Sequence, residues 1–181
     1  MTTMEEPSSS IPGREALSAP AGLSLDIEIV ETCLGDGDWQ QVVESAVCAA
    51  LSGGLTGPLP ASELYVELVA DDQSQDLNRD YRSKDKPTNV LSFPGTEPDD
   101  LPDALKAAAQ GGPPVMFGDL IIADAVVAAE ADEQGKSNKA HLTHLVVHGV
   151  LHLLGYDHIQ ESDAEEMEAL ERVILAGLGI A

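Results

Sequence analysis

The sequence has little cysteine and no apolar run long enough to cross a membrane. Its two cysteines, Cys33 and Cys48, do not form a C-x-x-C pair, which favours two reduced thiols over a disulfide. The longest apolar stretch, 142–154, is too short to span a bilayer and suits a buried helix. The N-terminal residues lack the basic start and apolar core of a signal peptide. We therefore expect a soluble, cytoplasmic protein.

Basic residues are also scarce. Nine lysines and arginines stand against 32 acidic residues, and the formal net charge is −23. Such a charge repels nucleic acid at long range. Four of the nine basic residues nevertheless fall within eight positions, namely Arg79, Arg82, Lys84 and Lys86. Charge alone leaves two interpretations of this segment open, a solvated turn or a phosphate-binding site.

Length and hydrophobic patterning predict a flexible tail at 1–22 and a single domain at 23–181. Apolar patterns predict strands at 23–30, 63–70, 89–93 and 115–122. Helical spacing predicts helices at 38–51, 72–81, 123–134, 138–154 and 162–175, with one helical turn at 104–109. Gly53 and Gly54 are expected to end the first helix. The mixture predicts an α+β or α/β layer sandwich, with a mixed sheet of about four strands packed against five or six helices.

The most informative segment runs from His148 to His158 and reads H-G-V-L-H-L-L-G-Y-D-H. On a helix, His148 and His152 lie one turn apart on the same face. Gly155 can end that helix in a left-handed conformation, and the following turn would bring His158 back towards the other two. Three neutral imidazoles with an open fourth position describe a catalytic zinc site better than a structural one. Imidazole also suits copper, iron or nickel, and we expect one zinc ion per chain.

The histidine spacing is that of the metzincin zinc peptidases, H-E-x-x-H-x-x-G-x-x-H, so the sequence predicts a metzincin-like metal-site helix. One position differs, because Gly149 replaces the glutamate that serves those peptidases as general base. The metal ligands therefore point to hydrolysis without naming the bond, and Gly149 argues against a metallopeptidase. His141 and His144 are predicted to support the ligands or to begin the helix rather than to bind the metal. Asp157 either orients a ligand histidine or caps the turn.

A second motif occupies residues 77–94 and reads L-N-R-D-Y-R-S-K-D-K-P-T-N-V-L-S-F-P. It matches the pattern L-N-x-x-Y-R-x-K-D-x-x-T-N-V-L-S-F-P. Together with the histidine segment, it resembles the bacterial YbeY family of single-strand-specific endoribonucleases, also described as rRNA maturation factors. The resemblance extends from about residue 64 to 175 and includes the segment Gly118-Asp119-Leu120-Ile121-Ile122.

This resemblance implies a zinc-dependent endoribonuclease domain with His148, His152 and His158 as the zinc ligands. Arg82 matches the family's functional arginine beside the metal, where zinc-bound water and a guanidinium would act on the phosphodiester. Without the family, an ion pair of Arg82 with Asp80 or Asp85 is the first interpretation of this side chain. The remaining basic residues of the segment would then hold the RNA backbone without reading its sequence. They are Arg79, Lys84 and Lys86.

The resemblance also implies a cellular role in 16S rRNA 3′-end maturation and ribosome quality control. The implied partners are single-stranded RNA, the 16S rRNA precursor, the small ribosomal subunit, a small-subunit ribosomal protein and an Era-type GTPase, with no membrane. Ribosomal proteins are basic, so an acidic protein would be steered towards them. Two alternatives stay open at this point, a zinc metallopeptidase and a non-catalytic ribosome assembly factor with a structural zinc.

Overall fold

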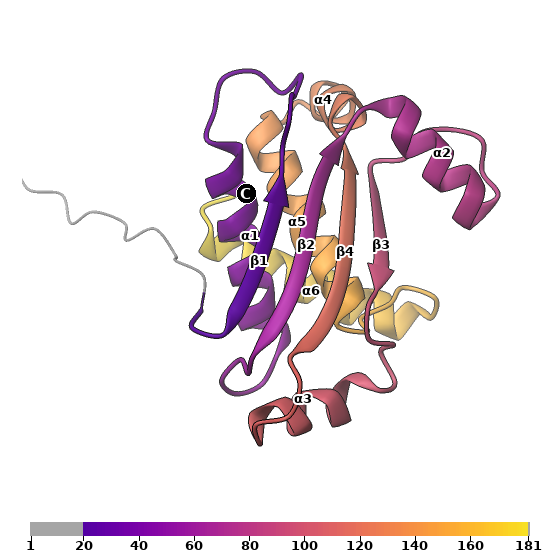
Figure 1. The fold of residues 1–181 in the computed structure, drawn as a ribbon. Helices are drawn as coiled ribbons and strands as arrows, with labels where there is room; N and C mark the ends of the chain where they lie inside the picture. Colours follow the sequence, from indigo (N-terminus) through magenta and orange to yellow (C-terminus); the bar gives the residue numbers. More distant parts are fainter. Residues whose placement is uncertain (1–19, 181) are drawn as a thin grey trace, which may run out of the picture.

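The computed structural model describes residues 20–180, which form one four-stranded mixed sheet and six helices (Figure 1). The strands are β1 (Leu23–Glu28), β2 (Ser62–Val69), β3 (Val90–Pro94) and β4 (Val115–Ala123). The helices are α1 (Trp39–Gly54), α2 (Asp71–Arg82), α3 (Leu101–Ala109), α4 (Asp124–Glu133), α5 (Asn138–Leu153) and α6 (Glu161–Gly177). The predicted α+β class is confirmed. Residues 1–19, most of the predicted tail, lie outside the described residues.

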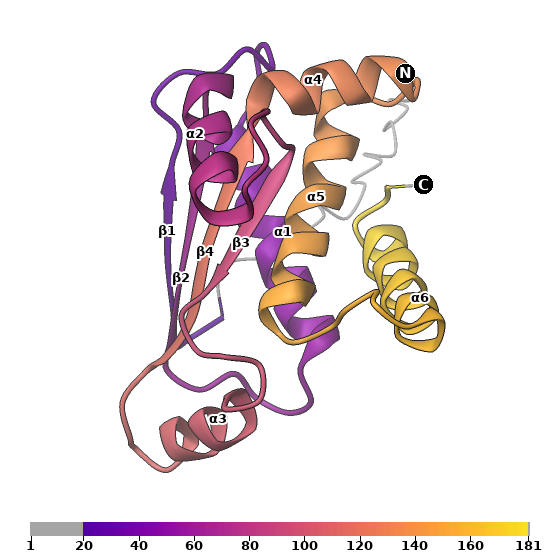
Figure 2. The same cartoon turned by 90° about the vertical axis from the view of Figure 1, so that its right-hand side faces the viewer.

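The sheet has the strand order β1-β2-β4-β3. Strands β1, β2 and β4 run parallel, whereas β3 pairs antiparallel with β4 and forms one edge of the sheet. Helices α1 and α5 cover one face, with α6 outside them, and α2 lies on the other side near β3 (Figure 2). Among residues 20–180, no helix has both the length and the apolar content needed to cross a bilayer. Cys33 and Cys48 are free thiols.

Helix α5 runs through the centre of the core and approaches the sheet closely. Its residues Leu142, Val146 and Val150 are fully buried. At Gly149, an added Cβ atom would lie 2.9 Å from Cδ2 of Leu120 on β4. It would also come within 3.3 Å of Val90 on β3. The glycine thus allows close contact between helix and sheet, because any side chain there would force the two apart.

Two glycines were predicted to end α1, and that prediction is wrong. The helix continues through Gly53 and Gly54 and ends at the extended residue Leu55. A Cβ atom on Gly53 would lie 2.8 Å from Ile174 of α6, and one on Gly54 would lie 2.6 Å from Leu154 after α5. The missing side chains therefore serve close packing between helices, and this gain outweighs the low helix propensity of glycine.

Candidate metal centre

The histidine helix begins and ends as its sequence predicts. The Ser137 hydroxyl accepts a hydrogen bond from the backbone N–H of Ala140 at 3.1 Å and caps the N-terminus of α5. At the other end, Gly155 takes a left-handed conformation with φ of 94°. Its N–H donates to His152 O, and the N–H of Tyr156 donates to Leu151 O, which is the Schellman pattern. This turn leads the chain back to His158.

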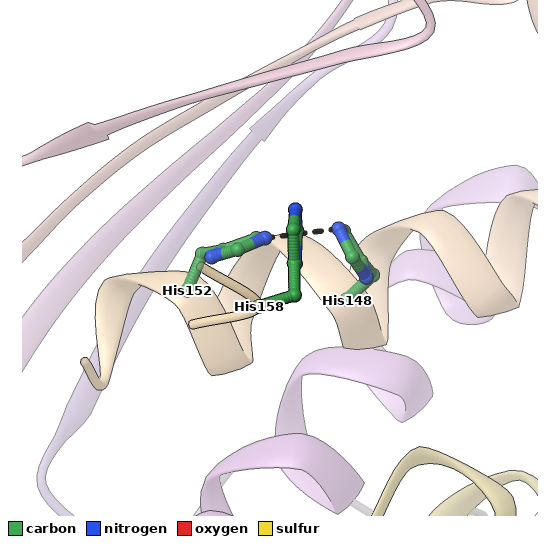
Figure 3. Close-up of side chains that lie close together, drawn as sticks. All are labelled: His148, His152 and His158. Carbon is green, nitrogen blue, oxygen red and sulfur yellow. Dashed lines mark hydrogen bonds between the residues drawn. The ribbon is translucent and has the colours of Figure 1, made fainter. Parts of the chain in front are cut away.

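The three predicted ligand histidines meet at one point (Figure 3). One ligand nitrogen from each of His148, His152 and His158 lies within 4.8 Å of the other two. The Nε2 atoms of His148 and His152 are 3.0 Å apart. Two nitrogens bound to one tetrahedral zinc ion lie about 3.3 Å apart, since each Zn–N bond is about 2.0–2.1 Å long. The donor set and its spacing therefore fit one divalent ion.

A carboxylate that the sequence analysis missed holds one of these rings. Glu171 of α6 is buried, with 7% of its surface exposed. Its Oε1 atom lies 2.5 Å from Nδ1 of His148, and its Oε2 atom lies 3.2 Å from Nε2 of His144. Because an ionised carboxylate only accepts, it favours the tautomer of His148 that carries its proton on Nδ1 and leaves Nε2 free to bind a metal.

The sequence contained a signal for Glu171. The residue lies on the buried face of α6, four positions after Met167 and three before Ile174, both of which are apolar and buried. An acid on a buried helix face needs a polar partner inside the protein. Burial alone would raise the pKa of Glu171, but the hydrogen bonds from His144 and His148 outweigh it and lower the pKa to about 2. The carboxylate is therefore ionised at neutral pH.

The other residues predicted to support the ligands lie close by but make different contacts. His144 lies edge to face with His148 and shares the carboxylate of Glu171 with it. Asp157 accepts a hydrogen bond from the backbone N–H of His158 at 2.6 Å, which is a turn-capping contact. His141, one turn earlier on α5, is buried and lies 2.8 Å from a carboxylate oxygen of Glu130. The histidine face of α5 thus receives one carboxylate from α4 and another from α6.

Arg82 is the only residue of the predicted basic segment that lines the cavity beside the three histidines. This cavity measures about 380 Å³ and is also lined by Ser92 and Pro94 of the edge strand. Arg82 ends α2, and the next residue, Ser83, turns the chain in a left-handed conformation with φ of 57°. Within residues 20–180, no carboxylate lies within ion-pair distance of the Arg82 guanidinium.

Arg79, and not Arg82, forms ion pairs with the two aspartates that the sequence suggested as partners of Arg82. Its guanidinium lies 2.8 Å from Asp76, 3.4 Å from Asp80 and 3.8 Å from Asp85. Lys84 and Lys86 are exposed on the loop that follows α2 but do not line the cavity. The Asn78 side chain donates to Lys86 O at 2.7 Å and ties this loop to the helix. The structure therefore separates Arg82 from the other three basic side chains.

A second cavity of about 530 Å³ shares four lining residues with the first, namely Asn89, Val90, His148 and His158. Carboxylates line it, contributed by Glu130, Glu168 and Glu171. The Asn89 amide donates to Glu130 at 3.1 Å, which links the loop after α2 to the pair formed by Glu130 and His141. The cleft at the histidines thus has one cationic end and one acidic end.

The titration of His152 provides a test of this site in the metal-free protein. Burial, followed by positive charge on His148 and His158, lowers the pKa of His152 to about 4. Between about pH 6.5 and pH 4, the unfolded chain therefore binds a proton that the folded chain does not. We expect the free energy of unfolding to fall by about 1–2 kcal/mol over this interval, after allowance for partial exposure.

NMR titration of the His152 ring and urea unfolding at several pH values measure this effect. His152→Gln is the control, because a glutamine at this position removes the titrating ring. A midpoint for His152 above pH 6 in the metal-free wild type would contradict the expected lowering of its pKa.

Comparisons with known proteins agree with this geometry. The family model described as "Endoribonuclease YbeY" matches residues 30–179. A protein of that name from Rhizorhabdus wittichii is 48% identical over 147 residues, which cover 79% of this chain and 85% of the relative. One from Novosphingobium aromaticivorans is 47% identical over 169 residues and covers 91% of this chain and 96% of the relative.

A solved structure shows the same fold. The solution structure of TM1509 from Thermotoga maritima matches with a TM-score of 0.51 at 22% identity, covering 86% of this chain and 91% of that one. The family match covers both motifs that carried the resemblance. The chain belongs to the YbeY endoribonuclease family.

Proposed function

We propose that this protein is a zinc-dependent endoribonuclease that cleaves single-stranded RNA. The observation that carries the proposal is the convergence of three imidazoles beside a cavity lined by a guanidinium that has no acidic partner among residues 20–180. Cleavage of a phosphodiester uses both features. It requires an activated nucleophile, which a metal held by the imidazoles would supply, and a cation to stabilise the negative charge that develops on the phosphate. The family name supports a nuclease.

Zinc fits the residues of the site. His152 is neutral at pH 7 because its pKa is lowered to about 4, so no proton competes for its lone pair. Glu171 holds His148 with Nε2 free, and the turn at Gly155 supplies the third ring. When bound, zinc would supply Lewis acidity and a nucleophile available near neutral pH. One ion per chain is proposed.

Arg82 is the group that would hold the scissile phosphate. A guanidinium can donate two parallel hydrogen bonds to phosphate oxygens and stabilise negative charge as it builds there. Arg82 is suited to this role because the neighbouring acids contact Arg79 instead. Lys84 and Lys86 are exposed on the adjoining loop and are proposed to contact more distant phosphates.

The packing of Gly149 argues against a metallopeptidase. In the peptidases with this spacing, the corresponding residue is the glutamate that acts as general base. Here even one added carbon atom would come within 2.9 Å of Leu120, so the position lies against the sheet with no room for an acidic side chain. The metal site therefore lacks that base for steric reasons as well as by sequence.

In the cell, we propose a cytoplasmic role in 16S rRNA 3′-end maturation and ribosome quality control. The proposed partners are the small ribosomal subunit, one of its proteins and an Era-type GTPase. The net charge of −23 supports this view, because it favours encounter with basic ribosomal proteins over bare nucleic acid.

The first prediction of this proposal concerns the metal. His148→Ala, His152→Ala and His158→Ala should each lower the zinc content, because each removes one of three ligands. Glu171→Gln keeps all three ligands and changes only the group that orients His148. It should retain the stoichiometry with about 10- to 100-fold weaker affinity. Elemental analysis and competition with a chelator measure the two quantities. Full zinc content in all three alanine variants would refute the ligand assignment.

The second prediction concerns Arg82. Arg82→Ala should lower the rate of single-stranded RNA cleavage about 10²- to 10³-fold while zinc content stays unchanged, because a charge-stabilising donor is lost. Arg79→Ala is the matched control and should stay within about threefold of wild type, since its guanidinium is occupied by acids. Wild-type cleavage by Arg82→Ala would contradict the proposed role of Arg82. Absence of cleavage by the zinc-loaded wild-type protein would instead favour an assembly factor with a structural zinc.

The third prediction concerns partner steering. The protein should bind a basic small-subunit ribosomal protein less tightly as the salt concentration rises, because ions screen long-range attraction. Isothermal titration calorimetry at low and high salt measures the change. Equal affinity under both conditions would show that charge does not steer this contact.

A further inference from the structure

Tyr81 is an exposed aromatic side chain beside the proposed phosphate site. It lies in the last turn of α2, and 69% of its surface is exposed. Its ring packs edge to face on Phe93 of the edge strand, with centroids 5.0 Å apart and an interplanar angle of 70°. A ring this exposed has at least one face open to solvent, while Phe93 restricts its orientation.

Each ring of the aromatic pair is next in sequence to a residue of the cleft, although Phe93 itself lines a separate cavity on the other face of the sheet, with Tyr65 and Asp119. Arg82, which follows Tyr81, and Pro94, which follows Phe93, both line the cavity that contains the three histidines. Neither ring lines the histidine cavity, so an RNA strand whose phosphate contacts Arg82 would reach the Tyr81 ring where the strand passes around the edge strand β3. Base and phosphate belong to the same nucleotide, so a ring and a guanidinium on adjacent residues can contact one nucleotide or two neighbours.

The scarcity of basic residues favours an uncharged contact between the protein and RNA. The protein has nine basic residues against 32 acids, and Arg79, next to the site, is engaged by three aspartates. Few cations remain to hold the backbone of an RNA strand near the cleft. Stacking of a base on an aromatic ring supplies affinity that does not depend on net charge.

We propose that Tyr81, supported by Phe93, is a stacking site for an unpaired nucleobase of the strand whose phosphate is held by Arg82. This inference rests on the proposed nuclease function and adds to it a physical source of preference for single strands. A base in a duplex has both faces covered by its neighbours, whereas an unpaired base can offer one face to the ring.

Two substitutions at Tyr81 test the inference. Tyr81→Leu removes the ring and keeps an apolar side chain, whereas Tyr81→Phe keeps the ring and removes the hydroxyl. Binding of a labelled single-stranded oligoribonucleotide is measured by fluorescence anisotropy, with the metal chelated so that the RNA stays intact. Tyr81→Leu should raise the Kd about 5- to 100-fold, and Tyr81→Phe should stay within about threefold of wild type.

An RNA series with one abasic position moved along the strand provides the specific readout. When the abasic position is that of the base that stacks on Tyr81, the RNA should bind wild type and Tyr81→Leu equally well, because it has no base to stack there. The salt dependence of binding should be the same for both proteins, because no phosphate contact changes. In cleavage assays, KM should rise with little change in kcat. Thermal unfolding checks that both variants are folded.

The possible outcomes distinguish failure of the stacking site from failure of the proposed nuclease function. If wild type cleaves single-stranded RNA and Tyr81→Leu binds as tightly as wild type, the stacking site is refuted while the nuclease stands. The stacking site is also refuted if Tyr81→Leu binds every abasic RNA more weakly than wild type does, by the same factor at each abasic position. If wild type neither binds nor cleaves single-stranded RNA, the nuclease proposal fails and this inference fails with it.

Discussion

The close contact between α5 and the sheet at Gly149 is the constraint on which the site depends. At this glycine the helix touches β4 and the edge strand β3, and the Ser92 hydroxyl donates to Gly149 O at 3.4 Å. The contact brings the histidine face of α5 to the edge of the sheet, where β3 and the loop after α2 supply the opposite wall. A bulkier residue would move the helix outwards and separate the imidazoles from Arg82.

A buried helix with four imidazoles along one stripe is costly to desolvate unless the rings have partners. Two neighbouring helices supply them. Glu130 of α4 lies against His141, and Glu171 of α6 contacts both His144 and His148. Some of the acidic residues of this protein therefore lie inside the fold, where their carboxylates accept hydrogen bonds from histidine N–H groups. One of these contacts, from Glu171 to His148, orients a predicted metal ligand.

The local features of this protein could be predicted from its sequence, and the long-range ones could not. The histidine site lies within eleven residues, so helix periodicity and one glycine turn determine most of its geometry. The prediction for the end of α1 is wrong because it rests on the local propensity of glycine, whereas the contacts with Ile174 and Leu154 come from distant segments. Glu171 was missed for the same reason, since its partner His148 lies 23 positions away.

The two arginines of α2 show this limit most clearly. Arg79 and Arg82 are three residues apart in one acidic helix, and composition gives no reason to separate them. The side-chain directions do separate them, because Arg79 lies among three aspartates while Arg82 lines the cavity at the histidines. The other end of the cleft is lined by Glu130, Glu168 and Glu171, which repel phosphate. A net charge of −23 is therefore compatible with a polyanionic substrate, because what governs binding is the charge at each end of the cleft.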